Sequence, residues 1–193
     1  ADAIKIAEDA GYFESDYDRE IIFTVKLWPQ DFNGMGGMNW RTSYMTNTNP
    51  GLSAHEVAHT FDINHANFWR VASANPLDSI GTLIEYGDRF DPMGDVQNFH
   101  HFNPRNKLRM GWLPPESVLT VSLSGTYTIR GIELGPQSGD NVNEFTALKI
   151  RRTPNSAFWV FYRSKEDSAN TGAIITLIGE QNSAKSLLLD MAP

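Results

Sequence analysis

Three histidines and one glutamate between residues 54 and 65 have the spacing of a metal site. His55 and His59 are four residues apart, so on a helix their side chains leave the same face one turn apart and can bind one ion. Glu56 lies too far round that helix to be the natural next ligand, but its carboxylate can hold and deprotonate a metal-bound water. His65 follows His59 by six residues, so the helix must end and the chain must turn back before the third imidazole can approach. With a fourth position left open for water, the stretch predicts a catalytic zinc site.

The competing interpretation is an ordinary amphipathic helix that happens to carry half-buried histidines. The whole chain has five histidines, and three of them fall in this short stretch. The extended pattern also fixes many positions at once, which a chance match rarely does. We therefore favour the metal site.

Composition indicates a folded, acidic chain without cysteine. Its 193 residues are 40% hydrophobic and 20% charged, which predicts one or two compact domains. Without cysteine, any metal must use nitrogen and oxygen ligands. The net charge of −7 and the lack of a basic patch argue against a nucleic-acid partner, and no apolar run is long enough to span a bilayer. The chain begins with Ala1 and has no signal-peptide pattern, so we expect a processed or trimmed piece of a longer precursor.

The segments before the zinc helix must position it. Residues 1–10 have a helical apolar spacing and predict a packing helix, and residues 21–28 are β-branched and aromatic, as in a buried strand. Residues 40–45 predict a further strand. Ser53 is a plausible N-cap for the zinc helix, with Glu56 completing a capping box.

A glycine-rich segment, residues 32–40, comes between these strands. Gly36 and Gly37 let its backbone approach another group closely. It would suit an edge strand that pairs with an extended peptide substrate, with these glycines near the substrate. A plain turn between strands is an equally good interpretation.

Acidic residues at positions 14, 16 and 18 are a second possible metal site. They could bind calcium, but the rest of a calcium loop is missing, so we favour a solvated turn. Calcium is therefore possible but unsupported by the sequence.

A tight turn at residues 85–94 is set by Pro92 and Gly94, with Met93 between them. Together with the histidine pattern, a turn that holds a methionine resembles the metzincin zinc peptidases. The strings at residues 65–69, 85–94 and 101–113 resemble the gametolysin family in particular, including its bacterial members. The resemblance covers most of residues 21–191.

This resemblance implies a secreted, zinc-dependent endopeptidase that is made as a proenzyme. It implies His55, His59 and His65 as zinc ligands, Glu56 as the general base, and Met93 as the methionine beneath the site. The fold that it implies is α+β, with a metzincin-like catalytic domain built from a mixed sheet, the zinc helix and the methionine turn.

Two positions depart from the metzincin pattern. Asp62 occupies the place of a glycine three residues after the second histidine. Glycine suits a helix exit with positive φ, and aspartate adopts that conformation at a cost of about 1 kcal/mol. Asp62 could also accept a hydrogen bond from a ligand imidazole, although we favour a tolerated substitution. Asp95 stands two residues after Met93, where some metzincins have a tyrosine ligand.

His100 and His101 are the remaining histidines. His101 could hydrogen-bond the substrate or a tetrahedral intermediate. Both residues could equally cap or line the turn, and this structural role is the one that we favour.

The chain changes character at Pro114 and Pro115. Six short β-like runs follow, separated by glycine, proline, asparagine and serine, at residues 118–123, 125–132, 145–150, 157–163, 173–178 and 187–189. We therefore expect a catalytic domain at residues 1–115 and a β-sandwich-like region at residues 116–193, which could pack on the catalytic domain.

The sequence as a whole predicts a monomeric metal-dependent hydrolase of protein or peptide substrates. Two other classes stay open. One is an inactive pseudo-peptidase that serves as an adhesion or binding module, which Asp62 keeps open. The other is a zinc hydrolase of non-peptide bonds.

Overall fold

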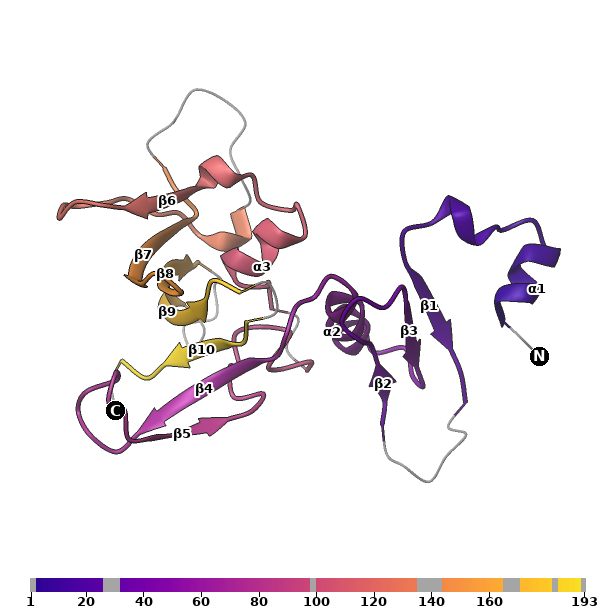
Figure 1. Ribbon diagram of the computed structural model, residues 1–193, viewed down its shortest axis with the longest axis horizontal. Helices are drawn as coiled ribbons and strands as arrows, with labels where there is room; N and C mark the ends of the chain where they lie inside the picture. The colour runs from indigo at the N-terminus through magenta and orange to yellow at the C-terminus, as the bar shows by residue number, and fades with distance from the viewer. Residues whose placement is uncertain are drawn as a thin grey trace. The chain divides into compact units, whose positions relative to one another are not determined.

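The computed structural model describes residues 3–25, 32–97, 100–134, 144–164, 171–181 and 184–191 (Figure 1). These residues form α-helices and two mixed β-sheets, an α+β structure as expected. The chain divides into two compact units, Ala1–Asp62 and Ile63–Pro193. We describe each unit separately.

The first unit contains two α-helices, one 3-10 helix and a three-stranded sheet in its described part. Its elements are α1 (Ala3–Asp9), η1 (Glu14–Asp16), β1 (Glu20–Phe23), β2 (Gly34–Met35), β3 (Thr42–Met45) and α2 (Pro50–Thr60). The strand order is β1-β3-β2, with β1 parallel and β2 antiparallel to β3. The sheet is therefore mixed, and β2 is one of its two edges.

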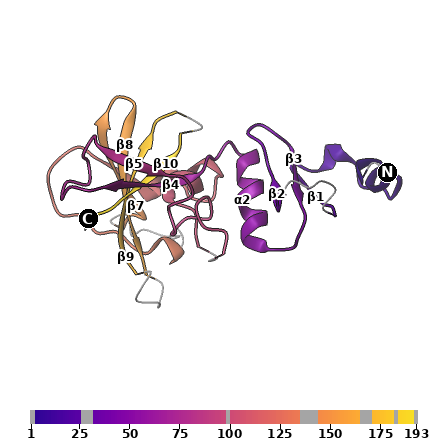
Figure 2. The same cartoon turned by 90° about the horizontal axis from the view of Figure 1, so that it is seen from below.

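Helix α2 packs against β2 and β3 (Figure 2). Along β3, the buried residues Ser43 and Met45 alternate with the half-buried Thr42 and Tyr44, as a strand with one covered face requires. Ala58 of α2 is also buried. The zinc helix of the prediction is therefore fixed to the sheet that precedes it.

Helix α2 begins four residues earlier than the sequence indicated. Asn49 is the N-cap, and its side chain accepts a hydrogen bond from the Leu52 N–H at 3.1 Å. Pro50 follows at the first helical position, where its fixed φ suits a helix and its missing N–H is not needed. The prediction of Ser53 as the N-cap is wrong, because the helix already begins after Asn49 and Ser53 lies within it.

The other expectations for this unit have mixed outcomes. The predicted strand at residues 40–45 is confirmed as β3. The buried strand predicted at residues 21–28 overlaps β1 at residues 21–23, but the side chains of β1 alternate between half-buried and exposed, and residues 26–28 lie outside the described residues. The predicted packing helix forms as α1, but it has no buried residue, and its most covered positions are the half-buried Ile4 and Ala7.

The second unit is built on a seven-stranded sheet. Its elements are β4 (Ala66–Val71), β5 (Gly81–Ile84), α3 (Pro104–Arg109), η2 (Pro115–Ser117), β6 (Val118–Val121), η3 (Ile132–Leu134), β7 (Ala147–Thr153), β8 (Ser156–Arg163), β9 (Gly172–Gly179) and β10 (Ser186–Leu189). The strand order is β5-β4-β10-β9-β8-β7-β6. Five of the six predicted β-runs contain a strand; residues 125–132 contribute isolated bridges at Ile129 and Gly131 instead.

This sheet crosses the domain boundary that we expected at residue 115. Strand β10 pairs in parallel with β4, so a strand from residues 66–71 lies inside the sheet of the C-terminal strands (Figure 1). A β-sandwich consists of two facing sheets, whereas the strands described in this unit form a single sheet. Short-range sequence patterns do not indicate pairing between segments more than 100 residues apart. The turn signals therefore suggested a domain boundary at residue 115.

The core of the second unit lies on one face of this sheet. Strand β8 alternates strictly, with its buried side chains at Ala157, Trp159, Phe161 and Arg163. The first three belong to a hydrophobic cluster with residues of β7, β9 and β10. Arg163 instead carries a charge into the interior. No helix within the described ranges is long and apolar enough to cross a membrane.

Candidate metal centre

Helix α2 brings His55 and His59 together. Four residues of helical rise and rotation place the two side chains on one face, and their Nε2 atoms lie 3.2 Å apart. The rings meet edge to face, and both side chains are buried. The sequence predicted this pairing from the spacing alone.

The chain turns back after α2 and brings His65 to the same place. The helix ends at Thr60, and Asp62 has a φ of +59°. One ring nitrogen from each of His55, His59 and His65 lies within 4.8 Å of the other two. The three histidines could therefore hold a metal ion.

The donor set fits zinc. Zinc binds imidazole nitrogen at about 2.0–2.1 Å in tetrahedral geometry, which separates two ligand nitrogens by roughly 3.4 Å. The 3.2 Å between His55 Nε2 and His59 Nε2 is close to this separation. Within the part of the chain that the structure describes, these histidines are the one group of three or more potential ligands that meet in this way.

Glu56 lies beside the two helical histidines in a confined environment. Its side chain is buried, and burial raises the pKa of Glu56 from 4.5 to about 7, although a hydrogen bond from the Gly36 backbone acts in the opposite direction. A carboxylate with this pKa can accept a proton and return it near neutral pH. Glu56 is therefore chemically suited to act as a general base.

The glycine-rich segment packs directly on Glu56. A Cβ on Gly36 would lie 2.1 Å from the Glu56 carbonyl oxygen, and a Cβ on Gly34 would lie 2.7 Å from Glu56 Cγ. The backbone at these positions is therefore too close to α2 for any side chain. Gly37 differs, because its Cβ would meet the indole of Trp40, which is a partly exposed side chain.

Asp62 links the helix exit to the glycine-rich segment. Its carboxylate accepts a hydrogen bond from the Asn39 N–H at 3.0 Å. The Asn39 side-chain amide, oriented with its nitrogen toward Asp62, donates to both carboxylate oxygens at 2.9 and 3.1 Å. Asn39 also has a left-handed backbone, with a φ of +60°. Asp62 thus adopts the backbone conformation typical of glycine while its side chain holds the preceding loop.

The methionine turn is tied to the residue that follows His65. The Ala66 N–H donates to the Met93 carbonyl at 3.0 Å, and Met93 is fully buried. A Cβ on Gly94 would lie 2.1 Å from the Asp88 carbonyl oxygen and 2.8 Å from that of Ala66. Glycine at position 94 therefore lets the turn lie directly against the start of β4.

A buried carboxylate shapes the same turn. One oxygen of Asp91 accepts a hydrogen bond from the Met93 N–H at 2.8 Å. The other accepts from the backbone and side-chain nitrogens of Asn103, both at 2.8 Å, and Asn103 is the N-cap of α3. Asp91 therefore connects the methionine turn to α3.

Asp88 adds a second buried carboxylate to this turn. Its Oδ1 accepts a hydrogen bond from the Phe90 N–H at 3.0 Å. Burial, together with the negative charge of Asp91, raises the pKa of Asp88 to about 7, and the nearby charge of Arg163 only partly opposes this. The turn thus contains a carboxyl group that is mostly protonated below about pH 7.

His101 occupies a different environment. Its Nδ1 lies 2.9 Å from Lys107 Nζ, and its carbonyl accepts a hydrogen bond from Arg163 at 2.7 Å. Lys107 belongs to α3 and is itself buried. His101 is not a member of the three-histidine group.

The acidic residues at positions 14, 16 and 18 lie in the first unit. Glu14 and Asp16 form the 3-10 helix η1, and Glu14 makes an ion pair with Arg41 at 3.7 Å. Glu14, Asp16 and Asp18 are exposed. This is the environment of a solvated turn.

Sequence reasoning gave no role to two residues that contact His65. Glu85 Oε1 lies 3.0 Å from His65 Nδ1, and the ring of Tyr86 lies 4.1 Å from the His65 ring between centroids. Both residues follow β5, which pairs with β4 in an antiparallel hairpin. These contacts follow from the pairing register of β4 and β5, which the spacing of the histidine motif does not indicate.

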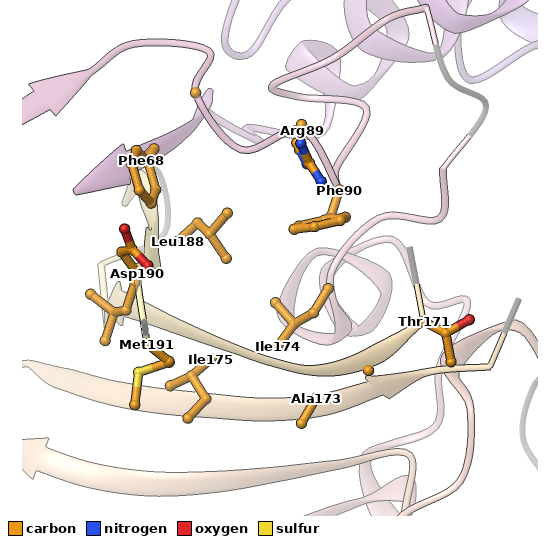
Figure 3. Close-up of a pocket in the computed structure, with 13 residues that line it drawn as sticks. Phe68, Arg89, Phe90, Thr171, Ala173, Ile174, Ile175, Leu188, Asp190 and Met191 are labelled. Carbon is orange, nitrogen blue, oxygen red and sulfur yellow. The ribbon is translucent and has the colours of Figure 1, made fainter. Parts of the chain in front are cut away.

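The second unit also has a pocket of about 480 Å³ that contains none of the predicted site residues (Figure 3). Phe90, Ile174 and Leu188 lie around the same opening in Figure 3, and Arg89 and Asp190 supply its charged groups. Asp190 is the one carboxylate among its lining residues, which do not include a histidine, cysteine or glutamate. The chemistry therefore concentrates at the histidines.

In comparisons with known proteins, no family model, no curated protein and no solved structure matches this chain.

Proposed function

We propose that this chain is the zinc-dependent endopeptidase that its motifs resemble, a secreted metzincin of the gametolysin kind that acts on protein or peptide substrates. One observation carries the proposal. Three histidine nitrogens lie within 4.8 Å of one another, and the buried carboxylate of Glu56 is adjacent in sequence to the first of these histidines.

His55, His59 and His65 would hold the zinc ion as neutral imidazoles, which leaves a tetrahedral position for water. Bound zinc would lower the pKa of that water toward neutrality and stabilise negative charge on the carbonyl oxygen of the scissile bond. Because imidazole must be unprotonated to bind a metal, we expect zinc release and loss of activity in mild acid.

Glu56 is the proposed general base. Its carboxylate would accept a proton from the attacking water and then pass it to the leaving amine. The Gly36 N–H, which hydrogen-bonds this carboxylate, would fix its orientation. Burial keeps competing bulk water away and matches the basicity of Glu56 to neutral pH.

Strand β2 is the proposed docking edge for the substrate backbone. In the sheet order β1-β3-β2 it pairs with β3 on one side. An extended peptide could add to the other side through main-chain hydrogen bonds. Because Gly34 and Gly36 lie against Glu56, a peptide on this edge would run past the proposed base.

The test is cleavage of an unstructured protein such as casein, with zinc content measured on the same samples. Glu56→Gln keeps the size of the side chain but removes the base. We expect it to retain zinc and to lose about 10²- to 10⁴-fold in turnover. His59→Ala is the matched variant, because it should lose both zinc and turnover. A chelator should abolish cleavage by the wild type.

Three results would overturn the proposal. Equal turnover in the wild type and Glu56→Gln would exclude the base. A wild type that binds zinc without cleaving any unfolded protein would indicate a binding module. Hydrolysis of small esters or glycans, but not of peptides, would indicate a different class of zinc hydrolase.

A further inference from the structure

His65 lies at one end of the seven-stranded sheet, where three strands place charged residues close together. His65 directly precedes β4, Glu85 directly follows β5, and Lys185 directly precedes β10. Strand β4 lies between the other two in the sheet. Sheet pairing, rather than closeness in the sequence, therefore determines the surroundings of His65.

The register of the β4–β5 hairpin positions Glu85. Phe68 pairs with Ile84 across the two antiparallel strands. Continued toward His65, this alignment brings Glu85, just after β5, opposite Asn67. The contact that results joins Glu85 Oε1 to His65 Nδ1 at 3.0 Å. A shift of one residue in this register would point Glu85 to the other face of the sheet.

Tyr86 limits the orientation of the same imidazole. Its ring packs on the His65 ring at 4.1 Å between centroids and an interplanar angle of 38°. Tyr86 has a φ of +58°, a conformation that is unusual for an aromatic residue. The Tyr86 N–H donates to Oδ1 of the fully buried Asn67 at 3.1 Å, which holds the backbone in this conformation.

The chemistry of the contact specifies a tautomer. A carboxylate can only accept a hydrogen bond, so the hydrogen must be on Nδ1 of His65. The neutral imidazole then carries its lone pair on Nε2, the nitrogen that can bind a metal. The contact with His65 also lowers the pKa of Glu85, as does Lys185, whose Nζ lies 3.2 Å from the same oxygen.

We propose that Glu85 is a positioning residue for the third metal ligand, fixing His65 as the tautomer that presents Nε2 to the ion, with Tyr86 packed on the ring. This inference rests on the zinc site of the proposed function and adds a residue to it. Carboxylate partners of this kind orient ligand histidines and raise their basicity. Glu85 acts through His65 and has no role in the bond cleavage itself.

Two measurements on the full chain test this role. The first is the tautomer of His65 in metal-free protein, from long-range ¹H–¹⁵N correlation spectra of the imidazole. The second is zinc affinity, from competition with a chromophoric chelator. For Glu85→Ala we expect a mixture of tautomers and zinc binding that is about 10- to 100-fold weaker.

Two further variants separate orientation from other effects. Glu85→Gln retains an oxygen that can accept the Nδ1 hydrogen, so we expect the tautomer to be restored and the zinc affinity to lie between those of wild type and Glu85→Ala. Lys185→Ala removes the other partner of Glu85 but leaves the contact with His65. Because an exposed ion pair contributes little, we expect zinc affinity within about threefold of wild type.

Either measurement can overturn the inference. A wild-type His65 that carries its hydrogen on Nε2 would overturn it, as would zinc affinity of Glu85→Ala equal to that of wild type. Failure of the proposed function would look different: the wild type would bind no zinc or cleave no peptide. The tautomer spectrum needs neither metal nor substrate, so it tests the effect of Glu85 on His65 separately from the zinc site.

Discussion

The two units position their parts of the candidate site by different physical means. In the first unit, His55, Glu56 and His59 lie on one helix, and helical periodicity alone brings the two imidazoles to 3.2 Å. In the second unit, His65 and Met93 lie outside regular elements. Strand pairing, a buried carboxylate and close backbone contacts hold these two residues.

Because the two parts of the site are positioned differently, mutations in them should have different effects. Some should reduce turnover, and others should reduce the stability of the fold. Around α2, close packing of the glycine-rich segment acts directly on Glu56. Around the methionine turn, buried hydrogen bonds connect the turn to α3. We therefore expect changes in the segment packed on Glu56 mainly to reduce turnover, and changes in the buried hydrogen bonds of the methionine turn mainly to reduce stability.

Among substitutions outside the proposed zinc ligands and base, the largest effect should come from Gly36→Ala. The added Cβ would meet the Glu56 backbone carbonyl at 2.1 Å, so the chain at Gly36, just after β2, must move away from α2. A displacement near 1 Å at a catalytic group can reduce turnover by about 100-fold. Zinc content should stay close to wild type, because no ligand is changed, and peptide hydrolysis with zinc analysis would measure both.

Gly37→Ala is the control for this variant. The three heavy atoms nearest to its Cβ would all belong to the side chain of Trp40, which is partly exposed and can move. Equal losses of turnover in the two variants would show that the segment tolerates no side chain at all, and that contact with Glu56 is not the cause.

Asp91→Ala should be the most destabilising of the substitutions considered in the second unit. It leaves the N–H of Met93 and two nitrogens of Asn103 without their acceptor, and each unsatisfied buried group costs about 1–3 kcal/mol. Because the charge repulsion with Asp88 is relieved at the same time, we expect a net loss of about 3 kcal/mol in the free energy of unfolding. Urea denaturation would measure it.

Asp95→Ala provides the comparison for Asp91→Ala. Asp95 accepts a similar hydrogen bond from the Gln97 N–H at 2.8 Å, but it lies in a half-buried position. If both variants lost the same stability, burial of the Asp91 carboxylate would not be what stabilises the turn.

Asp88 should give the second unit a pH-dependent stability. Its pKa is raised from 3.8 to about 7 in the folded chain, so the folded state binds this proton more tightly than the unfolded state. Its contribution is complete below the unfolded pKa and is lost as the pH rises toward 7. We expect the free energy of unfolding of metal-free protein to fall across this range, and to fall less in Asp88→Asn.

Asp88→Asn keeps an oxygen to accept the Phe90 N–H, so it removes the titration of Asp88 and its charge interaction with Asp91 but keeps this hydrogen bond. All other titratable groups are present in both proteins, so the difference between the two pH profiles reports on Asp88 and its interaction with Asp91. Parallel profiles for wild type and variant would rule out this contribution.

The smallest effects should come from Asp62. Asp62→Gly removes the bond to Asn39 but also the strain of a φ of +59°, and each effect is worth about 1 kcal/mol. We therefore expect Asp62→Gly to be about as stable as wild type. Asp62→Ala loses the bond and keeps the strain, so it should be less stable by about 1 kcal/mol. Unfolding curves would contradict this explanation if the alanine variant were the more stable of the two.

Short-range patterns predicted much of the fold. Alternating or β-branched runs located β3 and the five strands β6 to β10, and the third histidine implied the chain reversal that occurs at Asp62. The β4–β5 hairpin was missed, because residues 66–85 mix aromatic, polar and charged residues without a clear period. The start of α2 was misplaced, because a good capping box at Ser53 lies inside a helix that Pro50 had already begun.

Residue spacing along one segment was enough to identify the histidine group and Glu56, since a helix converts a separation of four residues into a shared face. The sequence did not reveal the contact of Glu85 with His65, the link from Asp91 to α3, or the parallel pairing of β10 with β4. Each of these joins segments whose approach depends on sheet register and burial. Such contacts are fixed when distant parts of the chain pack together, and no local pattern encodes them.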